Sequence, residues 1–134
     1  DLGEVYVIPF QFRQLMHNLI GNALKFAKPD LPSIIKITNE IVTADKVPDI
    51  NPNSKTQYYH ITVSDNGIGF EQQYHKRIFE VFQRLHDHQK IAGTGMGLAI
   101  AKTIVENHNG IIKASGELDK GATFDIYIPI KQNN

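Results

Sequence analysis

Hydrophobic and polar side chains alternate along this chain with two different periods, and each period predicts one kind of element. Between residues 10 and 27, apolar side chains recur every three or four positions, which is the spacing of one face of an α-helix. Pro29 and Pro32 predict the end of that helix. Residues 34–42 are rich in β-branched side chains, and residues 58–65 alternate between apolar and polar side chains, so both segments are predicted to be strands.

The same two patterns predict the remaining elements. Apolar side chains at helical spacing continue from Gly97 to about His108, where Asn109-Gly110 is a typical helix stop. The other predicted elements are strands at residues 4–8, 111–115 and 122–130, a short helix at residues 72–82, and loops at residues 44–56 and 83–93.

In chain order, the prediction is strand, helix, strand, long loop, strand, helix, loop, helix and hairpin. Helices do not alternate one for one with strands, and two pairs of strands have the pattern of hairpins. This order favours an α+β two-layer sandwich, with a mixed, mostly antiparallel sheet and helices on one face, over a doubly wound parallel sheet. The chain contains no linker and no internal repeat, so residues 1–134 are predicted to form one domain.

The composition excludes several classes of function. The 14 Lys and Arg residues balance the 14 Asp and Glu residues, so we expect no general attraction to nucleic acid or to an anionic membrane. No apolar run approaches the roughly 18 residues of a membrane span. Without cysteine there is no disulfide, no thiolate ligand for a metal and no cysteine nucleophile. The chain starts at Asp1 without a methionine, and we expect it to be a cytoplasmic part of a longer protein.

Three polar side chains form a stripe on the first predicted helix. Asn18, Asn22 and Lys25 are spaced by four and three residues, so they lie on one face of the helix. Amide oxygens can coordinate Mg²⁺, and a lysine ammonium can bind phosphate oxygens. A solvated helix face has the same periodicity, so the spacing alone leaves both interpretations open.

Asp65 lies at the end of a predicted strand in an unusual position for a carboxylate. Strand alternation places it on the same side as Ile61 and Val63, toward the core, where an unpaired charge is costly. Gly67 and Gly69 follow, and they would let a ligand approach the backbone, which suits recognition of an exocyclic amine such as that of adenine. The alternative is an Asx turn, because Asp-Asn-Gly is common in turns.

A glycine-rich segment precedes the last predicted helix. Gly93-Thr94-Gly95-Met96-Gly97-Leu98 would expose backbone N–H groups to a phosphate at the helix N-terminus, although a flexible hinge has the same composition. The segment lacks the Gly-Lys-Ser/Thr of a P-loop, and a loop precedes it instead of the strand of a dinucleotide-binding fingerprint. Thr123 either bonds a base or caps a turn. His86 and His88 are too small a set for a specific metal site.

In this order and spacing, the segments resemble the catalytic, ATP-binding domain of sensor histidine kinases. That family belongs to a superfamily with gyrase, heat-shock chaperone and mismatch-repair ATPases, and the resemblance implies its Bergerat ATP-binding fold. The matching motifs are Asn18–Phe26 (N box), Asp65–Phe70 (first glycine box), Ile78–Phe82 with Arg84 (F box), Gly93–Ile100 (second glycine box) and Gly121–Phe124 (final glycine/threonine motif). The segment Phe82–His86 is also similar to lids of histidine kinases, some of them phytochrome-like.

The resemblance implies a role for each matching residue. Asn22 would hold Mg²⁺ through its side-chain oxygen, with Asn18 on the phosphate side, and Lys25 would contact phosphate. Asp65 would accept a hydrogen bond from the adenine amine, with Thr123 close to the base. The implied catalytic residues are Asn18, Asn22, Lys25 and Arg84; the implied nucleotide-binding residues are Phe26, Asp65, Gly67, Gly69, Phe79, Phe82, Gly93, Thr94, Gly95, Met96, Gly97, Leu98 and Thr123. Residues 71–94 would form a mobile lid over ATP, attached through Phe79 and Phe82.

The implied function is that of an ATP-dependent protein-histidine kinase domain. It would bind Mg-ATP and transfer the γ-phosphate to a histidine on a separate dimerisation domain, for relay to an aspartate in the receiver domain of a response regulator. The helix that carries the phosphoacceptor histidine is not in this chain. We therefore expect the chain to bind ATP without phosphorylating itself, to be monomeric, and to belong to a homodimeric parent protein.

One position separates kinase from ATPase. Members of the superfamily that hydrolyse ATP have a glutamate general base four residues before the asparagine that binds Mg²⁺. Asn18 stands at that position here, and an amide cannot take a proton from water, so hydrolysis is expected to be slow. Two alternatives are a regulatory nucleotide-binding module and a serine kinase of the anti-sigma-factor type, whose phosphoserine product would be stable in acid.

Overall fold

Two helices and four strands make up the part of the chain that the computed structural model describes, residues 9–79 and 97–130. The helices are α1 (Pro9–Lys25) and α2 (Gly97–Asn107), and the strands are β1 (Ile35–Thr43), β2 (Gln57–Asp65), β3 (Ile111–Glu117) and β4 (Gly121–Pro129). Each of these six elements lies where the sequence pattern predicts it. The strand predicted at residues 4–8 and the loop predicted at residues 83–93 fall outside the described residues. Neither described helix has the length and hydrophobicity needed to cross a membrane.

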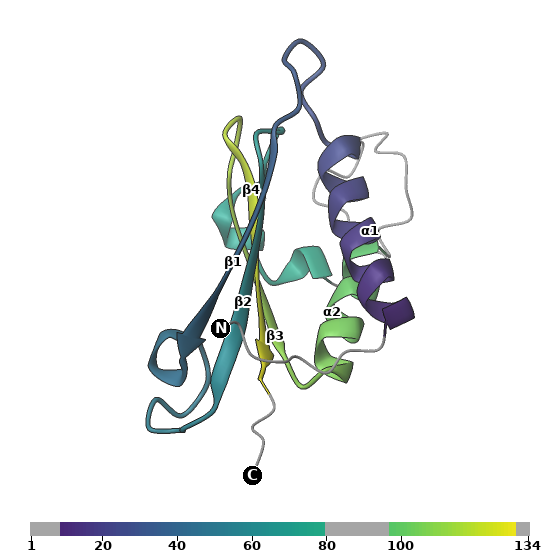
Figure 1. The fold of residues 1–134 in the computed structure, drawn as a ribbon. Coiled ribbons are helices and arrows are strands. Elements are labelled where there is room, and N and C mark those ends of the chain that lie inside the picture. The colour runs from purple at the N-terminus through teal and green to yellow at the C-terminus, as the bar shows by residue number, and fades with distance from the viewer. Residues whose placement is uncertain (1–8, 80–96, 131–134) are drawn as a thin grey trace.

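The four strands form one sheet in the order β1-β2-β4-β3, and every pair of neighbours is antiparallel. Both helices cover the same face of this sheet (Figure 1). The arrangement confirms the predicted two-layer α+β sandwich. It also brings the end of β2 and the turn between β3 and β4 to the same edge of the molecule, because Ser64 pairs with Thr123 and Thr123 pairs with Ser115.

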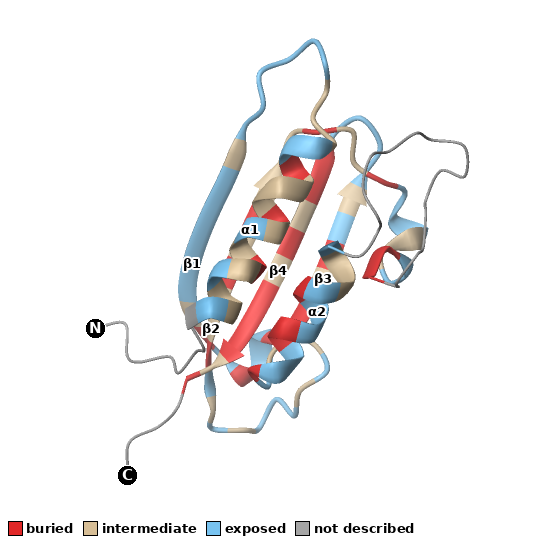
Figure 2. Cartoon of the chain, turned by 90° about the vertical axis from the view of Figure 1, so that its right-hand side faces the viewer, coloured by how far each residue is buried: buried red, intermediate tan, exposed pale blue. Residues whose placement is uncertain are grey.

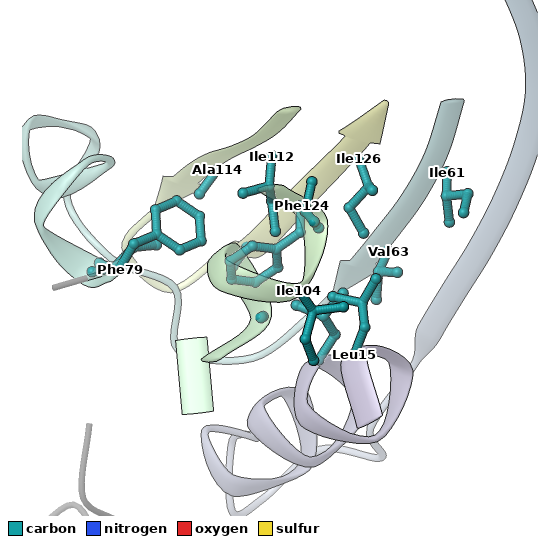
Figure 3. Packing of buried hydrophobic residues seen from close by; sticks show 14 of the residues in the cluster. Leu15, Ile61, Val63, Phe79, Ile104, Ile112, Ala114, Phe124 and Ile126 are labelled. Carbon is teal, nitrogen blue, oxygen red and sulfur yellow. The ribbon is translucent and has the colours of Figure 1, made fainter. Parts of the chain in front are cut away.

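The two helices pack side by side in opposite directions. Near the end of α2, Nδ2 of Asn107 donates a hydrogen bond to Oε1 of Gln11, near the start of α1, at 3.3 Å. Ile104 lies beside Leu15 further along the same pair of helices (Figure 3). Because each helical residue adds about 1.5 Å, the first turn of α2, which begins at Gly97, lies at the same end as the last turns of α1.

The main hydrophobic core lies between the helices and the sheet. Leu15 and Leu19 of α1 and Val105 of α2 are at most 1% exposed, and they belong to one cluster with Phe124 and Ile126 of β4. Figure 2 shows the buried faces of the helices turned toward β4. Full burial of a large aliphatic or aromatic side chain contributes about 1.5–3 kcal/mol, so this cluster is the main source of the fold's stability.

The connection between β1 and β2 covers part of the opposite face of the sheet. Val47 packs there in a second buried cluster with Tyr58 and Tyr127. Oδ2 of Asp49 forms an ion pair with Nζ of Lys113 at 2.6 Å, and the hydrogen bond from Lys113 lowers the pKa of Asp49 from its usual value. The polar composition of residues 44–56 predicts only a surface loop, so the anchoring role of Val47 is a finding of the structure.

The helix predicted at residues 72–82 is wrong over the described part of that range. The structure has two separate 3₁₀ turns there, Gln72–Tyr74 and Arg77–Phe79. The carbonyl of Gln72 accepts hydrogen bonds from both the backbone N–H and Nδ1 of His75, at 3.0 and 2.9 Å. A carbonyl that accepts a hydrogen bond from the residue three positions later closes a 3₁₀ turn. An α-helix needs that bond to come from the residue four positions later.

Candidate functional site

The polar stripe of α1 contains a buried donor. Oδ1 of Asn18 accepts a hydrogen bond from Nε2 of Gln14 at 3.2 Å. Nδ2 of Asn18 is buried, and no group among residues 9–79 and 97–130 pairs with it. Leaving a buried donor unpaired costs about 1–3 kcal/mol, so a partner such as a ligand oxygen is expected at this position. Asn22 is half-buried and Lys25 is exposed, in the last turns of the same helix.

The N-terminus of α2 lies at the same end of the helix layer as Asn22 and Lys25. Its first residue, Gly97, is exposed, and a Cβ there would meet no atom of the described residues within 4 Å apart from the helix's own backbone. Leu98 is half-buried and packs against the main core. A helix N-terminus offers backbone N–H groups and the positive end of the helix dipole. The Lys25 ammonium, the Asn22 amide and a helix N-terminus lie at one end of the molecule, and the Asn18 amide lies one turn before Asn22 on α1. These groups are chemically suited to phosphate.

Asp65 closes β2 at the same end of the sheet. Its Oδ1 accepts hydrogen bonds from the N–H groups of Gly67, at 2.8 Å, and Ala122, at 3.4 Å. The first of these bonds is an Asx turn, so the turn interpretation of Asp-Asn-Gly is confirmed. The described residues donate no hydrogen bond to Oδ2. The carboxylate therefore keeps one oxygen that can accept a hydrogen bond from a ligand.

Three segments that are distant in the sequence are joined around Asp65. They are residues 26–34, residues 65–69, and residues 117–121 in the turn between β3 and β4. The N–H of Ile68 donates to the carbonyl of Phe26, and the N–H of Asp119 donates to the carbonyl of Ile68, both at 2.9 Å. We call these three segments and the hydrogen bonds between them the backbone clamp.

Glycines allow the three segments of the backbone clamp to approach one another. A Cβ on Gly67 would lie 2.5 Å from a backbone oxygen, and a Cβ on Gly69 or Gly121 would overlap one. The oxygens concerned are those of Phe26 for Gly67, Glu117 for Gly69 and Asp65 for Gly121. The sequence alone predicts that Gly67 and Gly69 let a ligand approach the backbone. In the structure, these glycines admit other parts of the protein's own backbone.

Thr123 faces away from Asp65. Phe124 and Ala122 belong to the core beneath the helices, whereas Asp125 contacts His60 and Thr62 on the opposite face of the sheet. Alternation along β4 therefore puts Thr123 on that opposite face. The expectation that Thr123 lies close to a base does not fit this placement. Ala122, which the sequence analysis did not select, is the residue of β4 beside Asp65.

Several expected site residues lie outside the described residues: Phe82, Arg84, Gly93, Thr94, Gly95 and Met96. Phe79 is described, and it is a core residue. It is 7% exposed, and its ring meets that of Phe124 edge to face, with 6.2 Å between the centroids. Phe26, at the end of the N box, is half-buried, and its carbonyl is part of the backbone clamp.

A groove of about 400 Å³ lies elsewhere, beside the edge strand β3. Its lining includes Lys76, Lys102 and Lys113, together with Asp49 and Glu106. Of the residues selected from the sequence, it includes only Phe79. The groove is therefore separate from the group formed by the end of α1, the start of α2 and Asp65.

Comparison with known protein families gives a match over nearly the whole chain. The model of the family described as histidine kinase-, DNA gyrase B-, and HSP90-like ATPase matches residues 8–132. Cyanobacterial phytochrome A of Nostoc sp. is 42% identical over 120 residues, which are 90% of this chain and 14% of that protein. The phytochrome-like protein Cph1 of Synechocystis sp. is 40% identical over 130 residues, which are 97% of this chain and 16% of that protein. The chain thus spans less than a fifth of either relative.

Solved structures have the same fold. The nucleotide-free catalytic domain of the histidine kinase ThkA matches with a TM-score of 0.69 and 26% identity, over 96% of this chain and 73% of that one. Full-length ShkA in complex with AMPPNP matches with a TM-score of 0.68 and 26% identity, over 92% of this chain and 22% of that one.

Proposed function

This chain belongs to the family of histidine kinase-, DNA gyrase B- and HSP90-like ATPases, and we propose that it is the ATP-binding catalytic domain of a sensor histidine kinase. In this proposal the domain holds Mg-ATP and transfers the γ-phosphate to a histidine on a separate domain. The observation that carries the proposal is the placement of the Asp65 carboxylate and of the Asn18, Asn22 and Lys25 stripe at one end of the same two-layer fold.

Asp65 is proposed to recognise the base. Two backbone N–H groups hold Oδ1, so the direction of Oδ2 is fixed before a nucleotide arrives. A carboxylate oxygen accepts a hydrogen bond from the exocyclic amine of adenine. Guanine presents a carbonyl oxygen at the corresponding position, and two acceptors repel each other. The domain is therefore proposed to select adenine nucleotides over guanine nucleotides.

The stripe of α1 is proposed to hold the phosphates. The buried Nδ2 of Asn18 would find in a phosphate oxygen the acceptor that the described residues do not supply. Lys25 adds a positive charge, and the N–H groups at the start of α2 add further donors. The residues present also fit Mg²⁺, since the amide oxygen of Asn22 is a hard ligand. Among the described residues, no group of three or more His, Asp or Glu side chains could hold a metal ion. In this proposal, phosphate oxygens and water supply the remaining ligands of the ion. When bound, Mg²⁺ would neutralise charge on the phosphates.

The chemistry at position 18 favours transfer over hydrolysis. Attack by water needs a base to take its proton, and the Asn18 amide cannot act as one. A neutral histidine nitrogen is already nucleophilic, so transfer to histidine depends on positioning and charge neutralisation. The proposed partners are accordingly a phosphoacceptor histidine domain and, after it, the receiver domain of a response regulator. We place this relay in the cytoplasm, within a homodimeric parent protein.

The experiment that tests the proposal is calorimetric titration of the chain with AMPPNP and with GTP, each with and without Mg²⁺. The expected result is binding of AMPPNP that Mg²⁺ strengthens, and no binding of GTP. Equal binding of both nucleotides would contradict the role of Asp65. Absence of heat with every ligand would contradict the nucleotide site itself.

Phosphate transfer is tested separately, by adding radiolabelled ATP and a separately produced phosphoacceptor histidine domain of a sensor histidine kinase. Label that appears on that domain and is lost in acid supports a histidine kinase. Label that survives acid supports transfer to serine instead.

Sedimentation of the chain alone is expected to show a monomer, and a dimer at micromolar concentration would contradict this part of the proposal.

A further inference from the structure

The segment that follows α1 is held by one side chain from a distant part of the sequence. Nδ2 of Asn66 donates a hydrogen bond to the carbonyl of Pro32 at 3.0 Å. Oδ1 of the same amide accepts a hydrogen bond from the N–H of Ile34 at 2.9 Å. Both the donor and the acceptor of the Asn66 amide are thus hydrogen-bonded to the same segment. These two bonds fix the rotamer of Asn66 and the path of that segment.

A second side chain ties the same segment to the turn between β3 and β4. The ammonium of Lys28 donates a hydrogen bond to the carbonyl of Asp119. The N–H of Asp119 in turn bonds the carbonyl of Ile68, and the N–H of Ile68 bonds the carbonyl of Phe26. The bonds form a closed circuit, in which each of the three segments of the backbone clamp is bonded to the other two.

This circuit fixes the two ends of the candidate site relative to each other. The segment that it holds begins at Phe26, directly after the last turn of α1, which carries Asn22 and Lys25. Asp65 is held within the same clamp through its bonds to Gly67 and Ala122. The distance between the phosphate-binding end of the site and the Asp65 carboxylate therefore depends on how firmly the clamp is closed.

We propose that Asn66 and Lys28 are positioning residues, which hold the segment after α1 against the Asp65 strand end and thereby set the affinity for the adenine nucleotide without touching it. This inference rests on the proposed function, because it assumes that an adenine nucleotide binds between these two ends. The polar atoms of both side chains form hydrogen bonds with backbone groups of the clamp.

The test is the affinity of Asn66→Ala and Lys28→Met for AMPPNP and for adenosine, measured by calorimetry and corrected for the folded fraction. Each variant is expected to bind both ligands about five- to thirtyfold more weakly than the unchanged chain. Adenosine carries no phosphate, so its loss of affinity separates displacement of the base-binding end from the loss of a positive charge near the phosphates. Amide hydrogen exchange at Ile68 and Asp119, measured without nucleotide, is expected to be faster in both variants.

Asn51→Ala is the matched control. Oδ1 of Asn51 accepts a hydrogen bond from the N–H of Asn53 at 2.9 Å, so this variant also loses an exposed bond between a side chain and the backbone, far from the clamp. It is expected to keep its nucleotide affinity within twofold. If Asn66→Ala does not fold, Lys28→Met alone decides the question.

Three other outcomes would contradict one of the proposals. If the unchanged chain binds neither ligand, the proposed function fails, and the roles of Asn66 and Lys28 fail with it. If the unchanged chain binds and folded variants match it within twofold, only the positioning roles are wrong. If Lys28→Met weakens AMPPNP but not adenosine, Lys28 is a phosphate contact and not a positioning residue.

Discussion

At the scale of single residues, Asp65 shows how one carboxylate serves the fold and remains available to a ligand. Its Oδ1 stabilises the turn that ends β2, and its Oδ2 takes no hydrogen bond from the described residues. Strand alternation in the sequence predicted the direction of this side chain. The turn interpretation is confirmed, while recognition of adenine remains a prediction, and the two are compatible because they use different oxygens.

Replacing Asp65 by asparagine tests this division of roles. The backbone N–H groups of Gly67 and Ala122 would retain the amide oxygen, which would turn Nδ2 toward the adenine amine. Two donors would then face each other, so we expect at least a tenfold loss of AMPPNP affinity, which corresponds to about 1.4 kcal/mol, with little change in melting temperature without nucleotide.

The control for that substitution is Asp125→Asn, which alters a carboxylate on the opposite face of the sheet. It is expected to leave nucleotide affinity within twofold. A large drop in the melting temperature of Asp65→Asn, with AMPPNP affinity unchanged, would show that Asp65 serves only the turn.

Ala122 and Thr123 show how alternation along a strand assigns side chains to the two faces of the sheet. Alternation along residues 122–130 places Ala122 on the same side as Phe124, Ile126 and Ile128, and Thr123 on the opposite side. The family motif implies a role for Thr123 near the base, whereas alternation along the strand places Ala122, and not Thr123, on the face of Asp65. The close contacts of Gly121 could not be predicted in this way, because they depend on how distant segments meet.

Gly121→Ala is expected to destabilise the chain strongly. The backbone at this residue has φ of 118°, which L-residues rarely adopt, and a Cβ would overlap the carbonyl oxygen of Asp65. We expect a loss of about 2–4 kcal/mol in the free energy of unfolding, measured by urea denaturation. Gly21→Ala is the control: a Cβ there meets nothing within 4 Å, and the helix is expected to gain up to about 1 kcal/mol. Equal effects at both positions would contradict the clamp geometry.

At the scale of elements, the sequence predicted regular structure better than connections. The apolar periods of α1, α2 and the four described strands are local, so they can be read directly. The prediction of a helix at residues 72–82 failed because the turns there are set by hydrogen bonds from His75 to Gln72 and not by an apolar period. Asn66 and Lys28 were missed because their partners lie 34 and 91 residues away. No local pattern encodes such pairs.

The connection between β1 and β2 offers an independent test at this scale. Val47 is 5% exposed in the second cluster, although most of residues 44–56 are polar or proline. Val47→Ala is expected to lower the free energy of unfolding by about 1–3 kcal/mol, because two methyl groups are lost and the remaining space is filled incompletely. Lys46→Ala, at an exposed position beside it, is expected to change little. Nucleotide affinity is expected to remain unchanged in both variants, since the cluster lies across the sheet from the candidate site.

At the scale of the whole molecule, the 14 acidic residues balance the 14 Lys and Arg residues, and one local ion pair provides a testable pH dependence. Lys113, through its hydrogen bond and its charge, lowers the pKa of Asp49 from its usual 3.8. A carboxyl group whose pKa is lower in the folded state stabilises the fold above its unfolded pKa. That contribution is lost as the pH falls through the lowered value.

Asp49→Asn is therefore expected to be less stable than the unchanged chain at pH 7, and the difference is expected to be smaller at pH 3, below the usual pKa of 3.8. The Asp49 side chain is 68% exposed, so added salt is expected to reduce the difference. Urea midpoints at the two pH values, with and without 1 M salt, measure this. A difference in stability that is the same at both pH values would mean that the charge of Asp49 plays no part.

The backbone clamp has a consequence for the order in which the molecule would acquire its proposed nucleotide site. Its bonds join residues near the start of the described chain to the turn between the last two strands, with Lys28 and Asp119 91 residues apart. Contacts of such long sequence separation close slowly, because the chain entropy between them is lost first. Secondary structure in α1 and the β1–β2 hairpin can form early, but the proposed nucleotide site cannot be complete until β4 has paired. During synthesis, a chain that has not yet released residues 117–122 from the ribosome would fold in part and bind no nucleotide.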